Sequence, residues 1–287
     1  MIETAYRKIL VPTDGSENTS AATNYAIDMA RQIKAEITAL SVVDITNYAT
    51  IPGEPDNESP LYQSSEDAVQ RVIEAASALD INANGMIING IPSRDIVEAS
   101  QEYDIIVMGT TGRTGMTHLI LGSVASKVVR SSRSPVIVVR AGSTSSFKCE
   151  KMLIATDGGD SSIRSVRHGL SLAKAFGASV TALCVSDDIR MTVESKLGES
   201  RLANAAVNDV IAEGRKLDLK VEPKIISGSP AEVIVEASDE YDILVMGTHG
   251  RKGLAHFRLG SVAEAVIRTA KCPVMTVSSS TTQHQLK

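Results

Sequence analysis

Tryptophan is absent from this 287-residue chain, and phenylalanine occurs only three times. Proteins that hold nucleic acids usually present a basic surface and stacking aromatics, whereas this chain has a formal net charge of -5. Long apolar runs are missing as well, since no stretch approaches the roughly 20 residues that span a bilayer. We therefore expect neither a nucleic-acid partner nor a membrane partner.

The first residues, MIETAYRKILVPTDG, include the acidic Glu3 and lack the apolar segment and cleavage site of a secretion signal. Cysteine is scarce too, because Cys149, Cys184 and Cys272 are widely spaced and form no CxxC pair. This spacing favours neither a disulfide framework nor a zinc site. We expect a cytoplasmic protein with three buried, unreactive thiols.

Familiar catalytic and phosphate-binding motifs are also missing. The chain contains no GxxxxGK[ST] loop, no GxGxxG, no HExxH and no GxSxG elbow. The sequence therefore assigns no catalytic residue and no metal ligand. An anionic ligand would have to be held by local main-chain geometry.

An internal repeat is what the sequence does contain. The stretch KILVPTD (8–14) returns as KMLIATD (151–157), 143 residues later, and later segments repeat 138 residues apart, so the second copy lacks five residues. That loss falls between about residues 45 and 89, where TNYATIPGEPDNESPLY predicts a long surface loop. We expect two domains, 1–144 and 145–287, joined at AGSTSSFK (141–148), a short polar linker with little to bury.

Short β-branched runs alternate with helical patterns in each copy, which is typical of βαβ units. A helix with one apolar face follows a Ser16 or Asn18 cap, and Pro92 opens another helix. The pattern predicts the α/β class, with two tandem five-stranded parallel-sheet domains, each doubly wound in strand order 3-2-1-4-5 and three-layered α/β/α. In the first copy we expect strands near 8–12, 37–43, 84–88, 104–108 and 136–139.

Two unusual loops follow the first and fourth predicted strands, PTDG (12–15) and MGT (108–110). The strand order reverses between these strands, so both loops should meet in one crevice. The second loop continues as GTTGRTGMTHLILGS (109–123), repeated as GTHGRKGLAHFRLGS (247–261). Its glycines allow close approach or positive φ, and its end begins a helix whose first amides lack partners and attract phosphate.

Each of these features also has a structural interpretation. Glycines after a strand are ordinary turn residues, and an aspartate before glycine is a common turn or cap residue. Three loop histidines, His118, His249 and His256, can serve as general bases, as ligand contacts or as structural residues. The cations Arg113, Arg251 and Lys252 either screen phosphate charge or are simply solvated.

Both halves resemble universal stress protein domains, in the branch with GxxG, nine residues, then Gly-Ser or Gly-Thr. The resemblance rests on PTD or ATD after the first strand, on SVVD (41–44) and CVSD (184–187), on the glycine loops and on the final PVIVV-type strand. It covers nearly the whole chain and implies binding of ATP or AMP. Whether Mg²⁺ accompanies ATP stays open.

The resemblance also implies which residues surround the nucleotide. Asp14 and Asp157 would contact the base or ribose, and Val42 and Val185 would line the adenine slot. The remaining positions are Pro12, Thr13, Met108, Gly109, Gly112, Gly122, Ser123 and Val124 in one site, and Ala155, Thr156, Met246, Gly247, Gly250, Gly260, Ser261 and Val262 in the other. Two departures imply sites of unequal affinity, namely Ala155 in place of proline and Thr111 opposite His249.

These implications favour a stress-response regulator or sensor that holds up to two adenine nucleotides. The alternative is a nucleotide-hydrolysing or adenylyl-transferring enzyme, because TDGGDSS (156–162) resembles the SGGxDS loop of ATP pyrophosphatases, though with different aspartate spacing. A third possibility is an interaction scaffold with vestigial loops. Residues 136–139 should pair with 274–277 inside the chain as an intramolecular pseudo-dimer; a homodimer and an unknown protein partner remain open.

Overall fold

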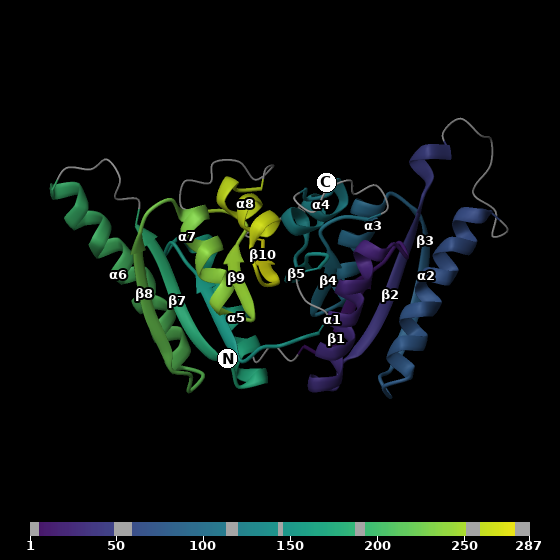
Figure 1. Ribbon diagram of the computed structural model, residues 1–287, viewed down its shortest axis with the longest axis horizontal. Coiled ribbons are helices and arrows are strands. Elements are labelled where there is room, and N and C mark those ends of the chain that lie inside the picture. The colour runs from purple at the N-terminus through teal and green to yellow at the C-terminus, as the bar shows by residue number, and fades with distance from the viewer. Residues whose placement is uncertain are drawn as a thin grey trace, which may run out of the picture.

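The computed structural model describes residues 6–48, 59–112, 120–142, 146–186, 193–250 and 259–278. The two halves repeat one order of elements (Figure 1). The first half consists of β1 (Lys8–Pro12), α1 (Glu17–Ile33), β2 (Glu36–Asp44), η1 (Ile45–Tyr48), α2 (Pro60–Ser77), β3 (Ala83–Gly90), α3 (Pro92–Ala99), η2 (Ser100–Glu102), β4 (Ile105–Gly109), α4 (Ser123–Ser131) and β5 (Val136–Val139). The second consists of β6 (Lys151–Ala155), α5 (Asp160–Phe176), β7 (Ser179–Ser186), α6 (Val193–Arg215), β8 (Val221–Ser227), α7 (Pro230–Ala237), η3 (Ser238–Glu240), β9 (Ile243–Gly247), α8 (Ser261–Thr269) and β10 (Val274–Val277).

All the strands of both halves lie in one ten-stranded sheet, in the order β3-β2-β1-β4-β5-β10-β9-β6-β7-β8. Within each half the neighbours are parallel, and the α/β class is confirmed. Each half has the doubly wound order, but the two five-stranded sheets are not separate. They join where β5 pairs antiparallel with β10, with Val138 opposite Val274.

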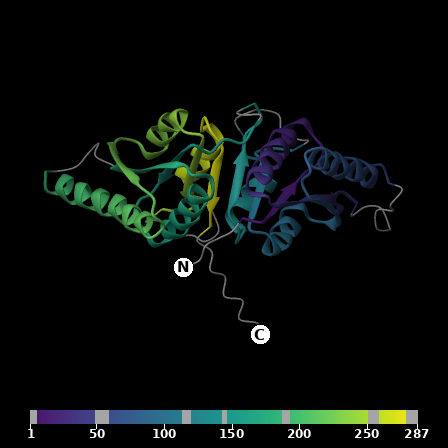
Figure 2. The same ribbon diagram turned by 90° about the horizontal axis from the view of Figure 1, so that it is seen from below.

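Helices cover both faces of this sheet (Figures 1 and 2). On one face α1, α2, α5 and α6 pack on one apolar core, and on the other α3, α4, α7 and α8 pack on a second. Successive strand residues serve opposite cores, as Ile9 and Val11 join the first and Leu10 the second. Such two-sided burial explains why the inner strands read as continuous apolar runs.

Strand ends differ from expectation where side chains hold main-chain groups. The fourth strand begins at Ile105, one residue later than predicted, because Asp104 acts as a cap. Its Oδ2 accepts from the N–H groups of Arg7 at 2.8 Å and Lys8 at 2.9 Å. Asp242 does the same in the second half, accepting from Glu150 and Lys151 at 2.9 and 2.8 Å.

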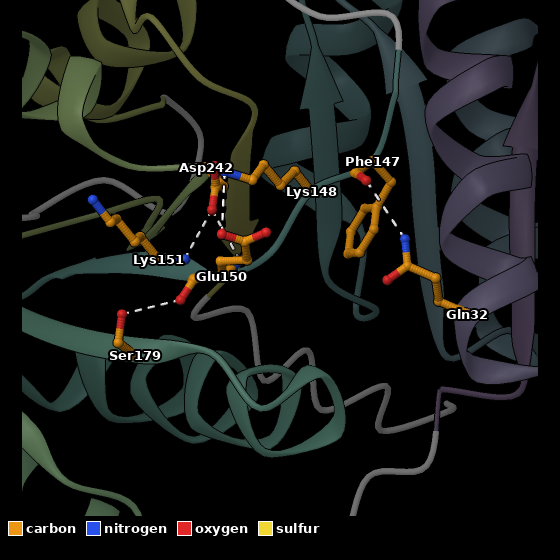
Figure 3. Close-up of polar contacts among 7 residues, drawn as sticks. All are labelled: Gln32, Phe147, Lys148, Glu150, Lys151, Ser179 and Asp242. Atoms are coloured by element: carbon orange, nitrogen blue, oxygen red, sulfur yellow. Dashed lines mark hydrogen bonds and ion pairs between the residues drawn. The ribbon is translucent and has the colours of Figure 1, made fainter.

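The predicted linker is the main correction. Phe147, in the stretch expected to bury little, is only 5% exposed. Its ring centroid lies 4.9 Å from that of Tyr25 on α1 and 4.6 Å from that of Phe176 on α5. Its carbonyl accepts from Gln32 Nε2 at 3.5 Å (Figure 3). A serine-rich composition hid one aromatic residue whose partners lie far away in the sequence.

Polar contacts also join the halves. The Arg164 guanidinium on α5 donates to the carbonyl of Ser278 at 2.9 Å and to that of Arg133, before β5, at 3.1 Å. The Tyr6 hydroxyl donates to the carbonyl of His168 at 3.0 Å. Together with the pairing of β5 and β10, these contacts confirm the predicted internal association of the last strands.

Cysteine burial agrees with the sequence. Cys149, Cys184 and Cys272 are all buried, and none forms a disulfide. Burial raises the pKa of Cys149 and of Cys272 to about 12, and Asp242 adds to the rise. A search of the described helices finds none with the length and apolar character needed to cross a membrane.

Candidate ligand-binding site

A cavity of about 320 Å³ lies over the carboxyl ends of the inner strands of the first half. Its position is the crevice expected where the strand order of a doubly wound sheet reverses. All of the predicted site residues of this half line it, namely Pro12, Thr13, Asp14, Val42, Met108, Gly109, Gly112, Gly122, Ser123 and Val124. The structure thus brings together residues from β1, β2, β4 and α4.

The loop after β1 holds the carboxylate of Asp14 in place. Asp14 Oδ1 accepts from the N–H of Ser16 at 3.0 Å and from the hydroxyl of Thr19 at 3.4 Å. Thr13 Oγ1 accepts from the N–H of Gly15 at 3.2 Å, and Gly15 has a φ of +74°, which glycine adopts easily. Ser16 occupies the N-cap of α1, as one of the two predicted caps, but its own side chain makes no capping bond.

The glycine loop after β4 comes very close to this carboxylate. A Cβ atom on Gly112 would lie 2.3 Å from Asp14 Oδ2, and one on Gly109 would lie 3.0 Å from the carbonyl of Asn18. The Asn18 amide donates to the carbonyl of Gly112 at 3.0 Å, tying the loop to α1. Neither Gly109 nor Gly112 has a positive φ, so close approach alone explains the glycines.

Helix α4 begins beside the same loop. The N–H of Gly122 donates to the carbonyl of Thr110 at 2.8 Å, which brings the helix start next to the end of β4. Gly122 is the N-cap, with no side-chain capping bond, and Ser123 follows it at the exposed first position of the helix. The first amides of a helix have no intrahelical acceptor and carry a partial positive charge, so this end attracts anions.

The second half repeats this framework. The N–H of Gly159 donates to Asp157 Oδ1 at 2.9 Å, and the N–H of Gly260 donates to the carbonyl of Thr248 at 3.0 Å. A Cβ on Gly250 would lie 3.0 Å from Asp157 Oδ2. The predicted residues of this half occupy the equivalent strand ends and helix start: Ala155, Thr156, Asp157, Val185, Met246, Gly247, Gly250, Gly260, Ser261 and Val262.

One predicted difference between the halves is visible. Thr248 Oγ1 lies 3.0 Å from His249 Nδ1, whereas Thr111 takes the place of the histidine in the first half. The other histidines and cations singled out in the glycine loops lie outside the described residues, namely Arg113, His118, Arg251, Lys252 and His256. The described residues contain no group of three or more side chains placed to hold a metal ion.

Sequence reasoning missed one wall of the cavity. Leu61 and Ser65 of α2, Ser41 and Val43 of β2, and Ile96 of α3 all line it. The apolar spacing of α2 reveals the inner face of that helix but not which of its residues lies above the strand ends. That placement depends on packing between segments distant in the sequence.

The lining suits binding better than catalysis. Apolar side chains predominate, two carboxylates are present, and the described lining residues include no histidine, lysine, arginine or cysteine. One wall, at the start of α4, offers main-chain donors, while Asp14 lies over the middle of the cavity. Such a site can hold an elongated molecule with an anionic end and hydroxyl or amino groups.

Two doubly wound domains fused into one sheet, each with an aspartate loop against a glycine loop at its strand ends, define the class of this protein. The sequence model of the Universal stress protein family matches residues 5–140 and 148–278. The chain therefore belongs to the universal stress protein family, as a tandem two-domain member.

Individual relatives agree with this assignment. Universal stress protein Rv2005c of Mycobacterium tuberculosis is 27% identical over 95% of this chain and 97% of its own. Universal stress protein MJ0531 of Methanocaldococcus jannaschii is 36% identical over 48% of this chain and 84% of its own. The crystal structure of a universal stress protein from Archaeoglobus fulgidus covers 98% of this chain and 100% of its own, with a TM-score of 0.75 and 25% identity.

Proposed function

We propose that this universal stress protein binds an adenine nucleotide, ATP or AMP, in each half, and that it acts as a stress-response regulator or sensor. The observation that carries the proposal is the meeting of Asp14, Gly112 and the start of α4 around one cavity. Main-chain donors there suit phosphate, and a carboxylate suits the hydroxyl or amino groups of a nucleoside.

The proposed roles follow from position. Phosphates lie over the start of α4, where Gly122 leaves room and Ser123 adds a hydroxyl. The nucleoside lies across β1 near Asp14, with Val42 and Met108 beside it. In the second half Asp157, Val185, Met246 and the start of α8 take the same roles. The domain limits 1–144 and 145–287 and the cytoplasmic location stay predictions.

Substitutions at the helix starts test the anion site. We choose Ser123→Asp and Ser261→Asp because both positions are exposed and begin a helix, where a carboxylate favours the fold by about 0.3–1 kcal/mol. Aspartate at a glycine cap is a poorer choice, since a Cβ on Gly260 would lie 2.9 Å from the carbonyl of Thr248. Gln101→Glu, on exposed η2, is the control for one added negative charge.

Calorimetric titration with ATP and with AMP gives the readout. We expect up to two sites in the wild type, loss of the first in Ser123→Asp, loss of the second in Ser261→Asp, and no change in Gln101→Glu. Phosphate and pyrophosphate release, followed in the same samples, tests the enzymatic alternative. If the double aspartate variant binds ATP as the wild type does, the proposed anion site is wrong.

A further inference from the structure

Two buried hydroxyls face the cavity of the first half without a partner. Ser41 on β2 is 2% exposed and Ser65 on α2 is 4% exposed, and both line the cavity. In the part of the chain that the structure describes, neither side chain makes a hydrogen bond. The neighbouring hydroxyls of Thr13 and Thr19, by contrast, lie 3.3 Å apart and serve the β1–α1 loop.

An unpaired hydroxyl in such a place needs explanation. Burying a hydroxyl costs free energy unless it regains a hydrogen bond, and most buried polar groups in native proteins have one. Because these two hydroxyls reach the cavity wall, the missing partner must occupy the cavity. A bound ligand or a water molecule supplies it.

The sheet order places the two serines at one end of the cavity. The cavity crosses β4, β1 and β2, which are consecutive neighbours in the sheet, and the start of α4 lies at the β4 end. Ser41 lies on β2 and Ser65 on α2, which packs against β2. A nucleotide with its phosphates at α4 and its sugar near Asp14 therefore extends its base toward these serines. This step rests on the proposed function.

The second half differs at both positions. By strand register Cys184 takes the place of Ser41, and by helix and β3/β8 register Ala203 takes the place of Ser65. The hydroxyl of Ser186, where the first half has Val43, is already paired with that of Ser227 at 2.9 Å. The equivalent wall of the second half therefore lacks both unpaired hydroxyls.

We propose that Ser41 and Ser65 are specificity-determining residues of the first site, where their hydroxyls bind the polar edge of the nucleotide base. A site built to hydrogen-bond a ligand rejects ligands that leave its buried polar groups unpaired. The first site therefore discriminates among bases more strongly than the second.

Binding to the first site alone gives the test. In the Ser261→Asp background, which closes the second site, we compare Ser65→Ala and Ser41→Cys, the residues found in the second half, with the parent. Ser77→Ala, at the exposed end of α2, is the matched control. The titrants are ATP, GTP and inorganic tripolyphosphate, which has no base.

We expect each cavity variant to bind ATP about 3- to 10-fold more weakly, as for the loss of one hydrogen bond, and to narrow the ATP-to-GTP ratio. Tripolyphosphate affinity and the response of Ser77→Ala should match the parent. The melting temperature of unliganded Ser65→Ala should equal or exceed that of the parent, because an unpaired hydroxyl is removed. A purely structural serine would instead lower it.

Two failures remain distinguishable. Should both serine variants bind ATP and GTP as the parent does, while Ser123→Asp abolishes binding, the nucleotide site stands and base recognition by the serines is refuted. A parent that binds neither ATP nor tripolyphosphate refutes the proposed function and the inference together.

Discussion

The two halves agree in the main chain and differ in the side chains that flank it. Asp14 against Gly112 and Asp157 against Gly250 repeat one close approach, and the starts of α4 and α8 repeat one loop closure. The walls made by α2 and α6, however, carry Ser65 and Ala203. Features that depend on backbone contact persist between the copies, while side chains that choose a ligand vary.

The junction shows the same divergence. Tyr6 and His168 meet across it, and the positions related to them by the repeat, 143 residues away, hold Cys149 and Tyr25. The hydroxyl of Tyr25 is buried and has no partner among the described residues. One side of the junction is therefore hydrogen-bonded and the other is apolar, so the halves are not interchangeable.

The largest effect is expected at Phe147, which packs between the two halves. Phe147→Ala should lower the free energy of unfolding by about 3–5 kcal/mol, the usual cost of removing a buried aromatic ring. Phe147→Leu should recover part of the loss. Urea unfolding measures both, and an alanine variant within 1 kcal/mol of the wild type would show that the linker does not join the halves.

Acid should weaken the junction through His168. Burial, and then the charge of Arg164, lower the pKa of His168 from 6.5 to about 4. The unfolded chain therefore binds the proton first, so stability is complete above pH 6.5 and falls as the pH drops toward 4, by at most about 3 kcal/mol.

Urea unfolding between pH 7.5 and 4.5 measures this loss. In His168→Asn the pH-dependent part should shrink by that amount, whereas other acid-sensitive groups are unchanged. Parallel pH profiles of the wild type and the variant would contradict the prediction.

Matched glycine substitutions should separate the two sites. Gly112→Ala places a Cβ 2.3 Å from Asp14 Oδ2, while Gly250→Ala places one 3.0 Å from Asp157 Oδ2. Overpacking of this kind costs about 1–3 kcal/mol, so we expect a larger loss of stability and of ATP affinity in the first half. Gly198→Ala, with open space around its Cβ, is the control. Equal losses at both sites would remove this asymmetry.

The smallest effect is expected at Tyr25. Tyr25→Phe removes a hydroxyl without a partner and keeps the ring contact with Phe147, so stability should be unchanged or rise by up to about 1 kcal/mol. Thermal unfolding checks this. A loss above 1 kcal/mol would mean that the hydroxyl has a partner in solution.

Much of the fold follows from local sequence patterns. The strands β1 and β5 have the predicted bounds, and α3 begins at Pro92 as expected. The site residues on β1 and β4 were predictable because strand order brings the ends of these two strands together. The α2 wall was not, since the length of the preceding loop varies between the copies and no local pattern places Ser65 over β2.

The sequence by itself determined the repeat, the class of fold and the glycines of the two loops, because periodicity and backbone sterics are local properties. Only the tertiary structure decided that the halves share one sheet, that Phe147 is buried between them and that two serines face the first cavity. Each of these depends on contacts between residues far apart in the chain, and composition within a short window carries no information about such contacts.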